Sequence, residues 1–166
     1  MANKKVEAAV ACCAVAFIVI LAIAAYWDPS IRVLHVFEAL PYLLVAVLCL
    51  RHARSGYAFG AVSGAFWLWT AGFRSTFIRN GLEQLAILLR TGAIHRAEIL
   101  IAVPAALATA GLVLFSAIGY ARIPNKSSRD LRDLIVAVVT VPLFFILIFA
   151  AFAPRYLAMF PFVSKR

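Results

Sequence analysis

Two pairs of ionisable residues in this chain share the same spacing. His35 and Glu38 form the first His-x-x-Glu pair, and His95 and Glu98 form the second. Residues three apart lie on the same face of a helix, so each pair is predicted to present an imidazole beside a carboxylate. Both pairs fall in long apolar stretches, where ionisable side chains are costly and often functional. These four residues are therefore the predicted polar site within the membrane.

Three kinds of chemistry fit such a site. If the two pairs face one another, their imidazoles and carboxylates could hold a metal ion, as in the cores of helix bundles. They could instead form a proton relay, because histidine exchanges protons near neutral pH. In the third interpretation each pair is local, and its carboxylate is stabilised by the dipole of a helix start. The sequence leaves all three open and implies no cofactor strongly.

The elements that must position these residues are membrane helices. The chain has 166 residues, 65% of them hydrophobic, and a mean hydropathy of +0.98. A backbone in hydrocarbon must satisfy its own amides, so the apolar stretches are predicted to be helical spans. The stretch after the third span has apolar residues at helical spacing between charges, which predicts an amphipathic helix in the interface. The prediction is an all-α integral membrane protein with one domain, residues 1–166, and a tail along the interface; its spans are about 6–27, 30–50, 55–73, 93–120 and 131–152, and its interfacial helix is about 74–92.

Two local patterns refine this arrangement. Asp28 and Pro29 follow the first span, where an aspartate can cap the next helix and a proline suits its first turn. Spans 6–27 and 30–50 should therefore form a tight antiparallel hairpin. In span 55–73, Gly56, Gly60 and Gly64 recur every fourth residue. Such a stripe lets two helix backbones approach closely, so these glycines are predicted packing residues.

The charge points to lipid rather than to nucleic acid. Lysine and arginine number 16 against 7 aspartates and glutamates, which gives a net charge of +9. The basic residues lie between apolar runs, so anionic lipid head groups are their expected partners. No soluble basic face is left for a nucleic acid. The predicted head-group contacts are Arg74, Arg79, Arg90, Arg122, Lys126 and Arg129.

The N-terminal flank and the cysteines suggest the compartment. Lys4 and Lys5 outweigh Glu7 before the first span, which favours an N-terminus in the cytoplasm of a bacterial cell and a place in its inner membrane. The first apolar run is longer than the core of a cleaved signal peptide, so we expect it to be retained. Cys12, Cys13 and Cys49 have no Cys-x-x-Cys spacing and are predicted to be buried thiols.

One family pattern appears faintly. Arg32, His35, Glu38 and Pro41, followed by Arg74, resemble a motif of the membrane-associated eicosanoid and glutathione metabolism proteins. That resemblance implies a glutathione- or lipid-linked transferase in which Arg32, Glu38 and Arg74 contact the tripeptide. The chain departs from the motif, because His35 stands where that family has asparagine.

The remaining features indicate a non-catalytic role. The chain lacks the Gly-x-Ser-x-Gly, P-loop and dinucleotide motifs. The leading prediction is a subunit or assembly factor of a larger membrane complex, with partner subunits or a second copy docking on span 55–73 or 93–120. One alternative is a small transporter or channel that uses the two His-x-x-Glu pairs. The membrane-bound transferase is the other.

Overall fold

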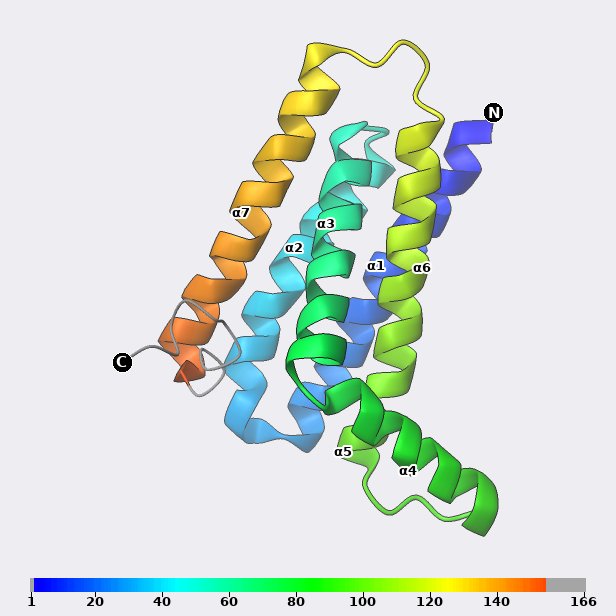
Figure 1. Ribbon diagram of the computed structural model, residues 1–166, viewed down its shortest axis with the longest axis vertical. Helices are drawn as coiled ribbons and strands as arrows, with labels where there is room; N and C mark the ends of the chain where they lie inside the picture. Colours follow the sequence, from blue (N-terminus) through cyan, green and yellow to red (C-terminus); the bar gives the residue numbers. More distant parts are fainter. Residues whose placement is uncertain (1, 155–166) are drawn as a thin grey trace.

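The computed structural model describes residues 2–154, and the side chains from residue 4 onward. Most of the described residues are helical, and the described part of the chain contains no strand (Figure 1). The predicted tail, from residue 155 on, lies outside them. In chain order the elements are α1 (Ala2–Trp27), η1 (Pro29–Ile31), α2 (Arg32–Leu50), α3 (Ser55–Trp69), η2 (Thr70–Arg74), α4 (Phe77–Thr91), α5 (Ala97–Leu100), α6 (Ala102–Ala121) and α7 (Ser128–Phe152).

Four helical segments are long and apolar enough to cross a membrane: Lys4–Trp27, Pro29–Leu50, Ala97–Ala121 and Ser128–Phe152. The α3 helix, which corresponds to the predicted third span, has only 15 residues. At 1.5 Å per residue it measures about 22 Å, less than the roughly 30 Å of a hydrocarbon core. The described part of the chain is thus a helical bundle with four candidate spans, consistent with an integral membrane protein, and α3 falls short of the criterion for a fifth.

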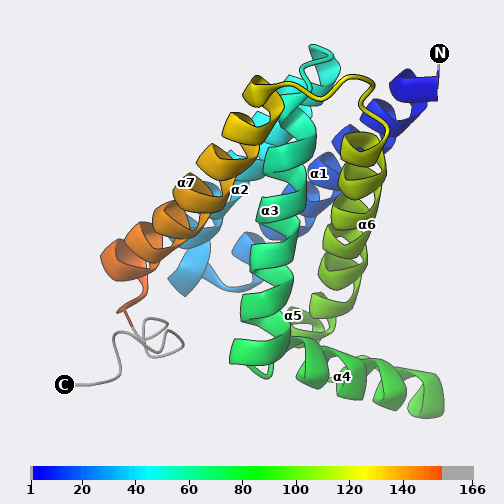
Figure 2. The same cartoon turned by 45° about the horizontal axis from the view of Figure 1, so that its top comes forward.

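Although it is short, α3 lies at the centre of the bundle, against α2, α6 and α7 (Figures 1 and 2). Its glycines make this possible. A Cβ on Gly56 would lie 2.8 Å from Cys49 Sγ, and one on Gly64 would lie 2.8 Å from Val113 Cγ2. Real Cβ atoms do not approach so closely, so the three-glycine stripe is occupied by helices of the same chain.

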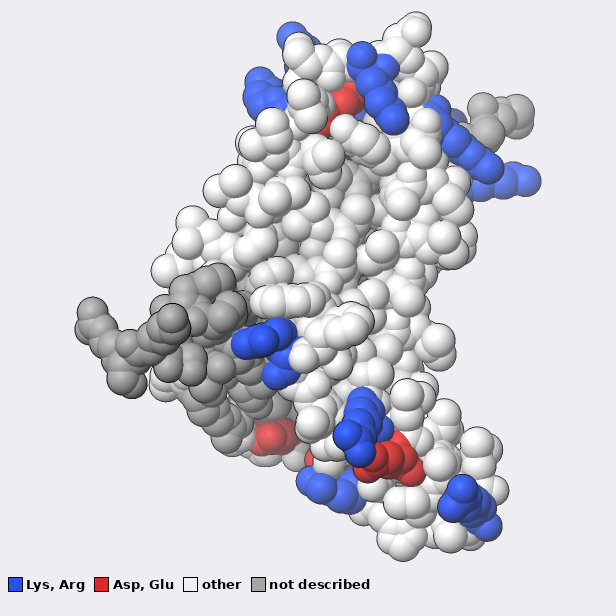
Figure 3. All heavy atoms as spheres, viewed as in Figure 1, with Lys and Arg blue, Asp and Glu red and all other residues white. Residues whose placement is uncertain are grey.

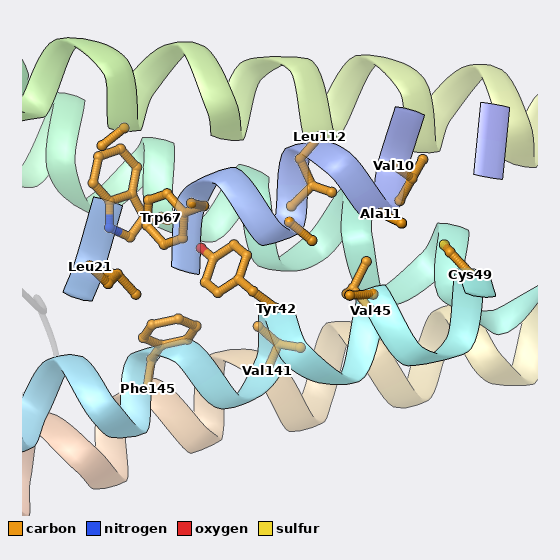
Figure 4. Close-up of a cluster of buried hydrophobic side chains, with 14 of the residues drawn as sticks. Val10, Ala11, Leu21, Tyr42, Val45, Cys49, Trp67, Leu112, Val141 and Phe145 are labelled. Carbon is orange, nitrogen blue, oxygen red and sulfur yellow. The ribbon is translucent and has the colours of Figure 1, made fainter. Parts of the chain in front are cut away.

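The core is continuous along the bundle (Figure 4). Val10, Val45 and Leu112 are fully buried in it. Towards the end where α1 meets α2, Phe17 packs on Tyr42 and on Trp67, with ring centroids 4.3 and 5.1 Å apart. Offset and edge-on ring pairs of this kind add to the packing that holds helices together in lipid.

The helix boundaries follow local capping. Asp28 accepts a hydrogen bond from the backbone N–H of Ser30 at 3.0 Å, and Pro29 opens the first turn, as predicted. The last helix begins at Ser128 rather than near residue 131, because Ser127 and Asp130 form a reciprocal capping box. Asp130 is therefore a buried residue of the first helical turn, and not part of an exposed loop.

The surface separates by polarity. Charged side chains gather towards the two ends of the bundle in Figure 3, and the broad middle of that face is uncharged. The prediction of three buried thiols is wrong in part: Cys49 is buried, Cys13 is half-buried and Cys12 is exposed on the outside of α1. In a bilayer such an exposed apolar surface faces lipid, which removes the pressure to bury a small residue like cysteine.

Candidate functional site

The first His-x-x-Glu pair forms as predicted. His35 Nδ1 and Glu38 Oε2 lie 2.7 Å apart, and their side chains are 13% and 8% exposed. Both belong to the first two turns of α2, whose direction is set by the Asp28 cap and Pro29. Glu38 lies six residues into the helix, roughly 9 Å from its start. We call His35 and Glu38 the cavity pair.

The second pair does not form. Gly92, with φ of 69°, ends α4 in the left-handed conformation, and the next helix begins only at Ala97. The observed start is four residues beyond the predicted start at about residue 93, so His95 lies in the non-helical connection, where it is exposed. Glu98 instead accepts a hydrogen bond from Arg96 Nε at 3.0 Å. The prediction that His95 and Glu98 share a helix face is wrong.

Glu98 nevertheless lines the same cavity as His35 and Glu38. A cavity of about 340 Å³ opens between the end of α1, the start of α2, the α3–η2 turn, α5 and α7. This size lies in the range of small-ligand sites. Its polar lining is Asp28, His35, Glu38, Thr70, Ser75, Arg96 and Glu98, and its apolar wall includes Leu21, Trp67, Phe77, Ile99 and Phe149.

The charge of this cavity differs from that of the chain. Asp28, Glu38 and Glu98 are three of the 7 acidic residues, and they face the cavity together with Arg96. The chain as a whole carries 16 basic residues and a net charge of +9. An acidic hollow in a basic protein attracts cations into a region of low dielectric constant.

A metal site and a glutathione site fit this geometry less well. The described part of the chain has no group of three or more His, Cys, Asp or Glu side chains placed to hold a metal ion. Of the residues linked to glutathione by resemblance, Glu38 lines the cavity and the two arginines do not. Arg32 Nε donates to the carbonyl of Ala25 at 3.2 Å, and the guanidinium of Arg74 lies 5.8 Å from the Trp69 ring centre.

A second acid–histidine pair at the opposite end was missed by sequence reasoning. His52 Nδ1 lies 2.5 Å from Glu7 Oε2, and the Tyr57 hydroxyl donates to Glu7 Oε1 at 3.4 Å. The side chain of Glu7 is 11% exposed and that of His52 is 59% exposed. We call Glu7 and His52 the N-terminal pair. A glutamate at the edge of an apolar run was the available signal, but its partner is 45 residues away and no periodicity links them.

The predicted head-group residues are all exposed and divide between the two ends. Arg122, Lys126 and Arg129 lie near the connection between α6 and α7, and Lys126 Nζ lies 5.0 Å from the centre of the Tyr120 ring. Arg74, Arg79 and Arg90 lie at or after the end of α3, where Arg79 pairs with a glutamate of α4. Basic groups at both ends suit contact with lipid head groups.

Comparison with protein-family models, with curated proteins and with solved structures finds no match. The geometry and charge of the site are therefore the basis for assigning a function.

Proposed function

We propose that this protein is a small membrane transporter that binds an amphipathic organic cation in the cavity beside His35 and Glu38. The observation that carries the proposal is the gathering of three carboxylates around an apolar hollow in a strongly basic chain. The apolar wall would take the body of the ligand and the acidic rim would take its charge. An aromatic side chain in the wall, Trp67, adds the preference of an indole face for cations.

The topology that goes with this proposal has five spans in a bacterial inner membrane, with the N-terminus in the cytoplasm. The fifth span would be α3 together with η2, which continues it without a break. Residues 55–74 taken together measure about 30 Å, enough to cross a hydrocarbon core. The cavity would then open towards the outer surface, at the end of the bundle away from the N-terminus.

Binding can be tested with benzyltrimethylammonium and neopentylbenzene, which have nearly the same shape and differ in charge. We expect the cation to quench the fluorescence of purified protein in detergent, and the neutral analogue to bind far more weakly. Trp67→Phe should remove most of the quenching, because Trp67 lines the cavity. Glu38→Gln and Glu98→Gln should each weaken binding by roughly tenfold, which corresponds to about 1.4 kcal/mol for one charge contact.

Glu83→Gln is the matched control, because Glu83 is an exposed glutamate of α4 outside the cavity lining. Its affinity should equal that of the wild type. Uptake of radiolabelled benzyltrimethylammonium by proteoliposomes tests transport as distinct from binding. Equal affinity for the cation and the neutral analogue would contradict the proposal, as would wild-type affinity in both cavity variants.

The second candidate function is an accessory role in a membrane complex. That prediction placed partner docking on span 55–73 or on span 93–120. Gly56, Gly60 and Gly64 of span 55–73 contact side chains of α2 and α6, so the stripe is covered and span 93–120 is left as the predicted docking surface. We therefore place transport ahead of an accessory role in a membrane complex.

A further inference from the structure

The cavity pair and the N-terminal pair lie at opposite ends of the bundle, and a series of polar side chains lies between them in its core. Glu38 begins this series on α2, and Tyr42 follows one turn later on the same buried face. The Tyr42 hydroxyl donates to the backbone carbonyl of Ser63 on α3 at 3.2 Å. The Tyr42 side chain points from α2 towards Trp67, at the cavity end of the core (Figure 4).

The series continues along the contact between α3 and α6. One turn from Ser63, Gly60 touches Ser116, whose Oγ lies 2.4 Å from the place of a Cβ on that glycine. One turn further along α6, Gly119 lies under the ring of Tyr57. The Tyr57 hydroxyl then reaches Glu7. Because α3 and α6 are antiparallel, each step moves further from the cavity pair and towards the N-terminal pair.

Two hydroxyls in this series are unusual. Ser63 and Ser116 are both 0% exposed, and within the described structure neither Oγ has a hydrogen-bond partner. Thr109, on the same helix as Ser116, forms the hydrogen bond that buried helical hydroxyls usually make. Its hydroxyl donates to the carbonyl of Ala105 at 2.8 Å. Buried hydroxyls without a protein partner are the groups that internal water molecules satisfy. Ser63 and Ser116 stand between Tyr42 and Tyr57 in this series, so water bound at the two serine hydroxyls would link the tyrosines.

We propose that a proton path crosses the bundle between the N-terminal pair and the cavity pair, through Tyr57, water at the two serines, and Tyr42. A proton enters on the exposed imidazole of His52 and passes to Glu7. At each later oxygen one O–H bond forms as another breaks, and the proton leaves through Glu38 and His35 into the cavity. The path carries one positive charge, so sustained flux needs a counter-ion. From Glu38 to His52 its length is roughly 20 Å, from the helical rise along α2.

This inference shares Glu38 with the proposed transport function but needs no organic cation, so the two fail separately. The test uses full-length protein in liposomes that contain a pH-sensitive dye. A potassium gradient with valinomycin drives protons and supplies the compensating charge. We expect the dye to report faster acidification of the liposome interior than in protein-free liposomes. Glu7→Gln and Glu38→Gln should each lower the protein-dependent rate roughly a hundredfold.

Ser116→Ala and Tyr57→Phe keep the packing against Gly60 and Gly119 and remove only a hydroxyl, so each should lower the rate without unfolding the protein. Thr140→Val is the matched control, because the Thr140 hydroxyl is exposed on α7 and donates to the carbonyl of Val136. It should conduct as the wild type does. Wild-type flux equal to that of empty liposomes overturns the proposal, and so does wild-type flux in both Ser116→Ala and Tyr57→Phe. These two variants also decide the case if a glutamate variant fails to fold.

Discussion

At the scale of single residues, Gly119 has the least room for a side chain of the described glycines, because it packs on Tyr57. A Cβ on Gly119 would lie 2.3 Å from Tyr57 Cε1, and Tyr57 is 1% exposed, so the ring has no space to retreat. Overpacking of this kind costs about 1–3 kcal/mol, and the better helix propensity of alanine returns up to about 1 kcal/mol. We expect Gly119→Ala to lower the free energy of unfolding by about 1–2 kcal/mol, measured by denaturation in mixed micelles.

Gly72→Ala serves as the comparison, since a Cβ there would meet nothing closer than Ile78 Cδ1 at 3.5 Å. That variant should be at least as stable as the wild type, because alanine has the better helix propensity and meets no clash there. Equal stability of the Gly119 and Gly72 variants would show that α3 and α6 are not packed as closely as described.

The candidate site was partly predictable residue by residue. His35 and Glu38 could be paired from their spacing, because both lie inside one uninterrupted helix. His95 and Glu98 have the same spacing, but Gly92 ends one helix and leaves His95 in a connection. The Glu7–His52 pair depends on how α1 meets the turn after α2, which is a tertiary contact without a local signal. Spacing predicts a shared face only where helix boundaries are also right.

At the scale of elements, α4 projects from the bundle (Figures 1 and 2). Leu82 and Leu89 are 54% and 78% exposed, while Gly81 packs against Ala102 of α6. An amphipathic helix tied to the bundle at one end and apolar on its free face is expected to lie in the membrane interface. The predicted helix, residues 74–92, corresponds to Phe77–Thr91 in the structure.

Spin labels in a variant without the native cysteines can measure this placement. Labels at positions 82 and 89 should be accessible to oxygen, which concentrates in lipid. Labels at positions 79 and 83, where Arg79 pairs with Glu83 at 3.2 Å on an exposed face, should be accessible to a water-soluble nickel complex. If oxygen accessibility does not alternate with the helical period along α4, this helix does not lie in the interface.

At the scale of the whole molecule, hydropathy predicted the bundle and located its helices, because the lipid phase imposes a strong and simple rule on the backbone. It did not predict how α3 would be accommodated. Its helix is 15 residues long, and the π-helical segment η2 continues it by five residues. The small residues that allow α3 to pack at the centre also make it the most protein-covered helix, so its length is not dictated by lipid alone. The position of the cavity follows from the same arrangement, because the cavity lies where α3 ends and η2 begins.

Whether α3 and η2 cross the membrane determines the sidedness of everything after them. If they cross, Ser30 and Thr91 lie on one side, and Ser128 lies on the other with the N-terminus. If they do not, Thr91 lies on the N-terminal side and Ser128 lies on the same side as Ser30.

Ser30, Thr91 and Ser128 are exposed residues in or next to connections, so each can be changed to cysteine in a cysteine-free background. We expect a membrane-impermeant maleimide to label Ser30→Cys and Thr91→Cys in intact cells, and Ser128→Cys only after the membrane is opened. Labelling of both Ser30→Cys and Ser128→Cys in intact cells would establish four spans. In that case α3 and η2 would not cross the membrane.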